Sequence, residues 1–355
     1  MNPILITSTD ESTGKTAVTL ALAQLARERG LDVGYMKPKG TRLQSAVGKT
    51  LDEDPLLARE LLDLDAEMAD LEPVVYSPTF VEQALRGRED ATALHERVRE
   101  SYDGLAADRD LVFIDGGGSF STGGVVDLTD ADVADLLDAT AVLIARYEQP
   151  GDVDAVLSAA RHLGDRLGGV LFNAVTDAAY DQLTTDVVPF LEGRGITVFG
   201  ALPRVQELAG VTVAELADDL GAQVVTADAP TDAFIERFTV GAMSADDALR
   251  QFRRTRDAAM ITGGDRSDIQ AAALEAPGIK CLLLTGGFRP AGAVVGRAEE
   301  EGVPILTVQT DTITAVERAE DVLRQGRARS AETVDVMRGL LEDGADVDGM
   351  LALAE

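Results

Sequence analysis

A loop near the N-terminus constrains this chain most: residues 8–16 read Ser-Thr-Asp-Glu-Ser-Thr-Gly-Lys-Thr. An apolar run at residues 4–6 precedes the loop and an apolar-periodic segment at residues 17–29 follows it, which predicts a strand, a loop and a helix. Backbone N–H groups in such a loop bind phosphates, while a lysine reaches the β- and γ-phosphates and a hydroxyl holds Mg²⁺. The residues assigned to this phosphate site are Asp10, Glu11, Ser12, Thr13, Gly14, Lys15 and Thr16.

The loop departs from the usual pattern G-x-x-x-x-G-K-[ST] at its first position. That position is Thr9, with Ser8 before it, and neither is a glycine. The alternative is an ordinary loop with a helix cap. The strand-to-helix context at the start of the chain favours phosphate binding.

The charge of the chain makes its lysines informative. Acidic residues number 62 against 32 basic ones, for a net charge of −30, and only five residues are lysine. A compact body with this charge repels itself in dilute buffer, so the composition predicts a halophilic protein adapted to high salt. The alternative is an acidic surface for a basic partner. Binding to nucleic acid or to an anionic membrane is not expected.

Two of those lysines follow the second predicted strand, residues 32–36. Ligand groups of α/β sheets lie at the carboxyl ends of strands, so Lys37 is a candidate catalytic residue together with Lys15. Lys39 has a weaker claim, and both could be ordinary surface lysines.

Two carboxylates are candidate Mg²⁺ ligands together with the Thr16 hydroxyl. Asp54 lies in the acidic run that opens a predicted helix at residues 55–62, and Asp115 follows the apolar strand 111–114 and precedes three glycines. Asp54 could equally be a helix-capping residue, and Asp115 a turn residue.

Strands then alternate with helices, which predicts a parallel sheet with helices on both faces. The strand at residues 169–173 ends in Asn173, a candidate for the adenine edge or a turn residue, and Pro203, which ends the next strand, is a further candidate for nucleotide binding. The single cysteine, Cys281, excludes an internal disulfide. The sequence shows no signal peptide and no apolar stretch of membrane-spanning length, which predicts a cytoplasmic protein.

The pattern restarts beyond a compositional seam at residues 211–224. Apolar strands ending in Thr-Gly-Gly occur twice, and a third strand ends in Gln-Thr-Asp-Thr. These strand ends form either a pocket for a small anionic ligand or simple turns. The candidate residues are Thr262, Gly263, Gly264, Asp265, Arg266, Thr285, Gly286, Gly287, Thr310, Asp311 and Thr312.

The first 215 residues resemble dethiobiotin synthetase. The resemblance rests on Gly14-Lys15-Thr16, on Lys37-Pro38, on Asp115-Gly116-Gly117, on Asn173 and on the segment 200–203. It implies that Lys37 contacts a diamine substrate and its carbamate, that Asp54 and Asp115 bind Mg²⁺, and that Asn173 recognises adenine. That family has Glu where this chain has Asp115.

The second half resembles a DRTGG domain, through residues 240–244, 261–266, 284–287 and 310–312. The two halves in this order resemble the N-terminal, non-catalytic portion of long bacterial phosphotransacetylases. We therefore expect a P-loop NTPase α/β domain at residues 1–215, a smaller α/β DRTGG-like domain at 216–328 and a helical tail at 329–355.

Two functions follow as hypotheses. One is an ATP- and Mg²⁺-binding regulatory protein of acetyl-phosphate metabolism, whose second domain senses a small metabolite; phosphotransacetylase activity is not expected of this chain alone. The other is an ATP-dependent ligase or ATPase that phosphorylates a carboxylate or carbamate. A partition-type ATPase lacks support, since residues 8–14 contain no lysine. The resemblance to dethiobiotin synthetase also implies a homodimer.

Overall fold

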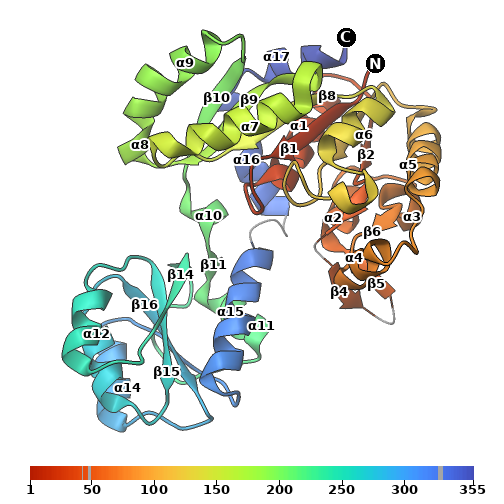
Figure 1. Ribbon diagram of the computed structural model, residues 1–355. Coiled ribbons are helices and arrows are strands. Elements are labelled where there is room, and N and C mark those ends of the chain that lie inside the picture. Colours follow the sequence, from red (N-terminus) through yellow and green to blue (C-terminus); the bar gives the residue numbers. More distant parts are fainter. Residues whose placement is uncertain (42, 47–48, 327–330) are drawn as a thin grey trace. The chain divides into compact units, whose positions relative to one another are not determined.

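The computed structural model describes residues 1–41, 43–46, 49–326 and 331–355 (Figure 1). The chain divides into two compact units, Met1–Val205 with Ala328–Glu355, and Gln206–Arg327. The second unit is therefore an insertion in the sequence of the first. The sequence placed the boundaries at residues 215 and 328 and treated the C-terminal segment as a separate tail, whereas its contacts assign it to the first unit.

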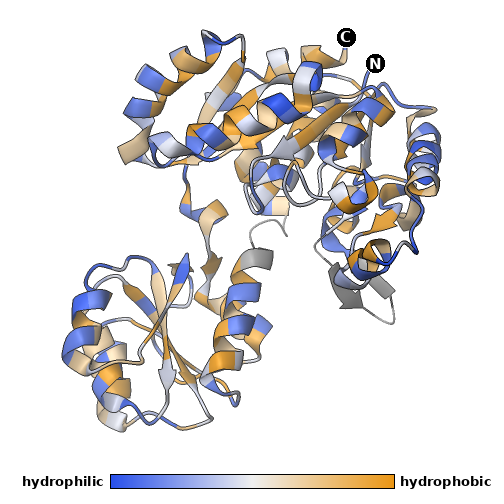
Figure 2. Ribbon diagram, viewed as in Figure 1, coloured by the Kyte–Doolittle hydropathy of each residue, from blue (hydrophilic) through white to orange (hydrophobic). Residues whose placement is uncertain are grey.

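The first unit is built on a parallel sheet with the strand order β10-β9-β8-β1-β7-β2. Its six strands are β1 (Ile4–Ser8), β2 (Val33–Met36), β7 (Leu111–Asp115), β8 (Thr140–Ala145), β9 (Leu167–Val175) and β10 (Val198–Pro203). The runs of apolar residues are buried on both faces, as expected for a parallel sheet covered by helices. Figure 2 shows these strands as mostly hydrophobic ribbons.

Helices cover both faces of this sheet. On one face, α1 (Lys15–Glu28) packs against β1, β2 and β7, and α16 (Ala331–Gly344) packs against α1 and β10. The other face is covered by α5 (Ala91–Ala106), α6 (Asp130–Leu137) and α7 (Val153–Leu163). The remaining helices of this unit are α2 (Glu53–Leu61), α3 (Met68–Leu71), α4 (Pro78–Leu85), α8 (Asp177–Gln182), α9 (Val188–Glu192) and α17 (Val347–Leu351).

Within the described residues of the first unit, four short strands lie outside the main sheet. β3 (Lys39–Gly40) pairs in parallel with β6 (Val74–Val75), and β4 (Leu43–Ala46) pairs with β5 (Lys49–Asp52) in antiparallel fashion. Lys37 lies between β2, which ends at Met36, and β3, which begins at Lys39, so paired strands hold the backbone on both sides of that residue.

The register of the central strands brings three sequence motifs to one edge of the sheet. Ile6 pairs with Asp115, and Met36 pairs with Ile114. Because β1, β7 and β2 are parallel neighbours, the loops that follow them leave the sheet at the same edge. This edge is where ligands bind in open α/β sheets.

The second unit contains a five-stranded sheet with the order β12-β17-β16-β15-β14, in which only the β12–β17 pair is antiparallel. Its strands are β12 (Gln223–Val224), β14 (Arg237–Val240), β15 (Ala258–Gly263), β16 (Ile279–Thr285) and β17 (Ile305–Thr307), with a separate pair, β11 (Val211–Thr212) and β13 (Phe234–Ile235).

Helices also cover both faces of the second sheet. One core includes residues from α12 (Ala245–Phe252), α13 (Ser267–Leu274) and α14 (Gly292–Glu300), and the other includes residues from α11 (Val213–Leu220) and α15 (Thr312–Gly326). A short helix, α10 (Gln206–Ala209), opens the unit. The predicted fold class, a parallel α/β sheet followed by a smaller α/β domain, is confirmed.

Alternating colours along the surface helices in Figure 2 mark their amphipathic character. Among the helices that the structure describes, none combines the length and apolarity needed to cross a membrane.

Candidate functional site

The loop after β1 ends in a glycine that immediately precedes the N-terminus of α1. Gly14 has a φ of +92°, a conformation that glycine adopts without strain, and Lys15 begins the helix. A Cβ at Gly14 would lie 2.6 Å from Asn173 Nδ2, so the loop also needs glycine for this close approach to the end of β9. The first N–H groups of α1 have no partner within the helix, which leaves donors available at the loop.

Asn173 secures this loop. Its Nδ2 donates to the Thr13 carbonyl at 2.8 Å, and its Oδ1 accepts from the Ala174 N–H at 2.9 Å. The sequence suggested an adenine contact for this residue; in the structure its amide holds the P-loop. Three other residues assigned to nucleotide binding, Asp10, Glu11 and Pro203, are exposed on the loop and at the end of β10.

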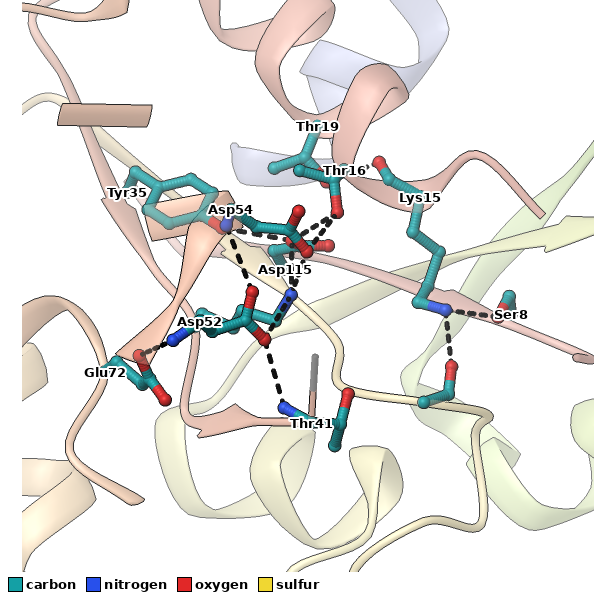
Figure 3. Close-up of polar contacts among 12 residues, drawn as sticks. Ser8, Lys15, Thr16, Thr19, Tyr35, Thr41, Asp52, Asp54, Glu72 and Asp115 are labelled. Carbon is teal, nitrogen blue, oxygen red and sulfur yellow. Dashed lines mark hydrogen bonds and ion pairs between the residues drawn. The ribbon is translucent and has the colours of Figure 1, made fainter. Parts of the chain in front are cut away.

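Lys15 extends along its own loop toward the glycines after β7 (Figure 3). Its Nζ donates to Ser8 Oγ at 2.8 Å and to the Gly118 carbonyl. Burial lowers the pKa of this ammonium, and the nearby carboxylates of Asp115 and Asp130 oppose that shift. The ammonium is therefore held in the space between the two loops, where a phosphate would replace these neutral oxygens.

Thr16 brings the two predicted metal ligands together. Its Oγ1 lies 3.0 Å from Asp54 Oδ2 and 2.9 Å from Asp115 Oδ2, and both carboxylates are buried (Figure 3). Tyr35 OH donates to Asp115 Oδ2 at 3.0 Å, and burial raises the pKa of the Asp115 carboxyl. Asp115 lies 99 positions from Thr16 and is brought close by the parallel pairing of β1 with β7, whereas Asp54, 38 positions from Thr16, comes from the first turn of α2.

Lys37 lies among three carboxylates. Its Nζ pairs with Asp54, lies 3.2 Å from Asp52 Oδ2 and 3.5 Å from Asp115 Oδ2, and its side chain is only 2% exposed. Burial alone would lower the pKa of this ammonium, but the three carboxylates outweigh burial and raise it. Lys37 is therefore charged, and the predicted catalytic lysine and predicted metal ligands share one cluster.

Asp52 and Glu72 belong to this cluster, although the sequence assigned neither a ligand role. Asp52 caps α2 by accepting from the Asp54 N–H at 3.0 Å, and it accepts from the Thr41 N–H at 3.1 Å. Its own N–H donates to Glu72 Oε2 at 3.0 Å. Burial raises the pKa of the Glu72 carboxyl to about 7. The acidic run at residues 52–54 was a visible signal for Asp52, whereas Glu72 had none.

Lys39 lies outside the carboxylate cluster. Its Nζ is 2.6 Å from Asp130 Oδ1, and Thr7 Oγ1 donates to Asp130 Oδ2 at 2.5 Å, with all three side chains buried. A Cβ at Gly117 would lie 2.3 Å from the Lys39 carbonyl oxygen, so the glycine segment after Asp115 packs directly against the backbone of β3. The lysine therefore has a structural partner of its own.

Arg146 is a site residue that sequence reasoning missed. It follows β8, next to β1 in the sheet, and its Nη2 donates to the Ser12 carbonyl in the P-loop. Burial lowers the pKa of its guanidinium, and the neighbouring positive charge of Arg204 lowers it further. Its position directly after an apolar strand was the signal that could have identified it.

The side chains around Thr16 fit a hard cation. Asp115 Oδ1 is buried without a hydrogen-bond partner, and the other groups offered are carboxylate and hydroxyl oxygens. Within the described ranges, no group of three or more His, Cys, Asp or Glu side chains could hold a metal ion by itself. Mg²⁺ in nucleotide sites uses one or two carboxylates and takes further ligands from phosphates and water, so the pair Asp54 and Asp115 suffices.

In the second unit, the loops that follow β15, β16 and β17 are joined by hydrogen bonds. The Gly264 N–H donates to the Thr285 carbonyl at 3.1 Å, and the Gly286 N–H donates to the Thr310 carbonyl at 2.9 Å. The hydroxyls of Thr285 and Thr312 lie 2.8 Å apart. The structure therefore brings the three predicted segments together at the carboxyl edge of the sheet.

Several of the polar groups predicted to bind a ligand in the second unit have structural partners. Thr262 Oγ1 donates to the Gly241 carbonyl at 3.0 Å, and Arg266 pairs with Asp268. Asp311 caps α15 by accepting from the Ile313 N–H at 2.9 Å. Asp265 is exposed. The hydroxyls of Thr262, Thr285 and Thr312 and the carboxylate of Asp311 therefore form hydrogen bonds within this edge of the sheet.

Both halves of the chain match models of known protein families. Residues 2–212 match a family model described as an AAA domain, and residues 215–322 match the DRTGG domain. The chain belongs to this AAA domain family. The predicted pairing of a dethiobiotin synthetase-like P-loop domain with a DRTGG domain is confirmed.

Curated relatives resemble the chain over different lengths. The phosphate acetyltransferase of Pseudomonas putida is 26% identical over 345 residues, which cover 92% of this chain and 48% of that protein. The ATP-dependent dethiobiotin synthetase of Methanocaldococcus jannaschii is 27% identical over 181 residues, covering 49% of this chain and 80% of that protein. The chain spans about half the length of the phosphate acetyltransferases that it matches.

Solved structures give more distant similarities. The MinD cell division protein of Aquifex aeolicus has 15% sequence identity and a TM-score of 0.36, covering 59% of this chain and 84% of that one. The CBS and DRTGG domains of the regulatory region of Clostridium perfringens pyrophosphatase have 24% identity and a TM-score of 0.27, covering 33% of this chain and 49% of that one.

Proposed function

We propose that the first unit binds ATP with Mg²⁺ and that the protein acts as a regulatory, metabolite-sensing protein of acetyl-phosphate metabolism. One observation carries the nucleotide proposal: Lys15 and Thr16 lie at the start of α1, with Thr16 Oγ1 within 3.0 Å of two buried carboxylates. A loop suited to phosphate binding and a group of oxygen ligands suited to a hard cation therefore lie at the same helix N-terminus. The name of the archaeal relative, an ATP-dependent synthetase, supports ATP as the nucleotide.

Each residue has a defined role in this proposal. Lys15 exchanges its bonds to Ser8 and Gly118 for phosphate oxygens, and the N–H groups around Gly14 bind the same phosphates. Thr16, Asp54 and Asp115 would hold Mg²⁺, which would supply positive charge next to the bound phosphates.

The regulatory part of the proposal rests on the second unit and on the relatives. Its four parallel strands end at one edge, where Phe288 is exposed beside the tied loops. Edges of this kind are the default ligand position in α/β sheets, so we place a small-metabolite site there. The similarity to phosphate acetyltransferases over 92% of this chain supports the link to acetyl-phosphate metabolism. A homodimer belongs to the same proposal.

Calorimetric titration of ATP and Mg²⁺ in molar KCl tests the nucleotide site. We expect the wild type to bind and Lys15→Ala to lose at least about tenfold in affinity, because a charged hydrogen bond to phosphate contributes about 1.5–3 kcal/mol. Lys280→Ala is the matched control, because Lys280 lies in the second unit. Absence of binding by the folded wild type would overturn the proposal.

An ATP-dependent ligase is the second candidate function, and Lys37 is the observation that favours it. This buried ammonium lies beside the predicted metal ligands and after the strand next to β7, where it could orient an anionic substrate toward the γ-phosphate. Release of ADP that depends on an added carboxylate, or on CO₂ with a diamine, would establish the enzyme. ATP binding with negligible turnover under all of these conditions would exclude it.

A further inference from the structure

Two consecutive carbonyl groups of the P-loop accept hydrogen bonds from side chains of other strands. Arg146, directly after β8, donates through Nη2 to the Ser12 carbonyl. Asn173, in β9, donates through Nδ2 to the Thr13 carbonyl at 2.8 Å. In the sheet β8 is the neighbour of β1, and β9 is the neighbour of β8 (Figure 1). The parallel sheet therefore places two side-chain donors against the same short stretch of the loop.

Ser12 adopts a backbone conformation that favours glycine. Its φ is +54°, in the left-handed region that glycine enters freely and that other residues enter at a cost. Gly14, two residues later, has a φ of +92°. A backbone that includes left-handed residues can direct successive N–H groups to one side, an arrangement that binds anions. The shape of the phosphate-binding loop therefore depends on a left-handed residue at position 12, where the chain has a serine.

The Arg146 side chain is suited to hold this conformation. A hydrogen bond from a charged guanidinium is stronger than one between neutral groups, and the planar guanidinium is preorganised to donate it. A change of Ser12 to a right-handed or extended conformation would turn its carbonyl to another direction and break this hydrogen bond. The arginine thus stabilises the left-handed conformation relative to the alternatives.

We propose that Arg146 is a positioning residue that holds Ser12 in its left-handed conformation and so keeps the P-loop in the shape that binds phosphate. The arginine acts through the Ser12 carbonyl and not through contact with the nucleotide. This inference deepens the proposed function and rests on it, since it requires the P-loop to bind a nucleotide. It predicts that Arg146 becomes dispensable when position 12 carries a residue that adopts a positive φ freely.

A double-mutant cycle between positions 146 and 12 tests this inference, with ATP and Mg²⁺ titrated in molar KCl. With Ser12 present, Arg146→Met should weaken binding at least about tenfold, because the loss of a charged hydrogen bond lets Ser12 leave the left-handed region. Combined with Ser12→Gly, the same substitution should cost about twofold or less, because glycine adopts the positive φ without support. An equal loss in both backgrounds would overturn the inference.

The same cycle excludes a direct electrostatic role of Arg146. A positive charge near bound phosphates would raise the affinity whatever residue stands at position 12, so its removal would cost the same in both backgrounds. The charges of Arg204, Glu148 and Asp10 also act on this guanidinium. Their effects are present in both backgrounds and cancel when the two losses are compared.

Arg146→Lys decides the question if Arg146→Met does not fold. Lysine keeps the positive charge, but its strongly hydrated ammonium on a flexible stem holds a carbonyl less firmly than the guanidinium does. We expect Arg146→Lys to bind ATP several-fold more weakly than the wild type and Ser12→Gly to abolish that difference. Wild-type affinity of Arg146→Lys would assign the role to charge alone and overturn the inference.

Arg166→Met is the matched control. Arg166 pairs with Asp135 and Asp138 and directly precedes β9, at the opposite edge of the same sheet, so its replacement should leave ATP affinity unchanged. Circular dichroism and the melting temperature without nucleotide establish that each variant is folded. Failure of the proposed function looks different, because neither the folded wild type nor any variant would then bind ATP with Mg²⁺.

Discussion

At the P-loop, the side-chain amide of Asn173 donates to the Thr13 carbonyl, so replacing it disturbs the loop first. Asn173→Ala should weaken binding of ATP and GTP equally, by about fivefold each, because a lost buried hydrogen bond costs about 1 kcal/mol. If Asn173 instead reads the adenine edge, affinity for ATP should fall and affinity for GTP should not. Competition titrations with the two nucleotides separate these outcomes.

Glu72 is the residue from which we expect pH dependence. Burial raises the pKa of its carboxyl from 4.5 to about 7, so the folded protein binds a proton that the unfolded chain releases. An acid with a raised pKa in the folded state makes the free energy of unfolding decrease as the pH rises, here between about 4.5 and about 7. Above about pH 7, Glu72 is ionised in both the folded and the unfolded state, and the free energy of unfolding no longer changes with pH on its account.

Glu72→Gln checks this assignment. Unfolding by denaturant is measured for both proteins at several pH values, and the difference between them removes the contributions of other groups such as Asp115. The wild type should lose stability relative to the variant as the pH rises through the window. A constant difference would mean that Glu72 does not titrate there.

At the scale of elements, the strand ends of the first unit were predictable. The P-loop, Lys37 and Asp115 each follow an apolar run, and parallel pairing then forces them to one edge. Long-range partners were not predictable, since nothing local to Lys39 indicates that Asp130, 91 residues away, will neutralise it. The position of Arg146 beside the P-loop likewise depends on β8 pairing with β1.

The C-terminal helices show the same limit. The sequence described residues 329–355 as a tail, yet α16 packs on α1, Arg338 Nη1 lies 2.8 Å from Glu28 Oε1, and the Asn2 N–H donates to the Ala354 carbonyl. An amphipathic pattern tells that a helix has an apolar face but not which surface covers it. Here the covering surface belongs to the first helix of the chain.

Deleting residues 331–355 should therefore prevent the first unit from folding. The deletion removes several buried apolar side chains, each worth about 2 kcal/mol on burial, against a total stability of about 5–15 kcal/mol for a typical domain. These side chains are Val334, Met337, Leu341, Val347 and Met350. Circular dichroism and ATP titration in molar KCl measure the loss. A truncated protein that folds and binds ATP normally would show that these helices are dispensable.

For the whole molecule, the net charge of −30 is the property with the largest expected consequence. Acidic residues are spread through both units, so their mutual repulsion acts on the entire folded surface. The Debye length falls from about 10 Å at 0.1 M salt to about 3 Å at 1 M, which removes most of the repulsion between exposed charges. The unfolded chain spreads the same charges farther apart and gains less from screening.

We therefore expect the melting temperature to rise strongly between about 0.1 and 2 M KCl. Several exposed Arg–Asp pairs, such as Arg166 with Asp135 and Arg109 with Asp32, weaken under the same screening, but each is worth less than about 1 kcal/mol. The summed repulsion should outweigh them. A variant in which exposed Asp and Glu residues are replaced by Asn and Gln should need less salt to reach the same melting temperature. If the wild type melts at the same temperature across this range, the repulsion argument is wrong, and the alternative of an acidic surface for a basic partner is favoured.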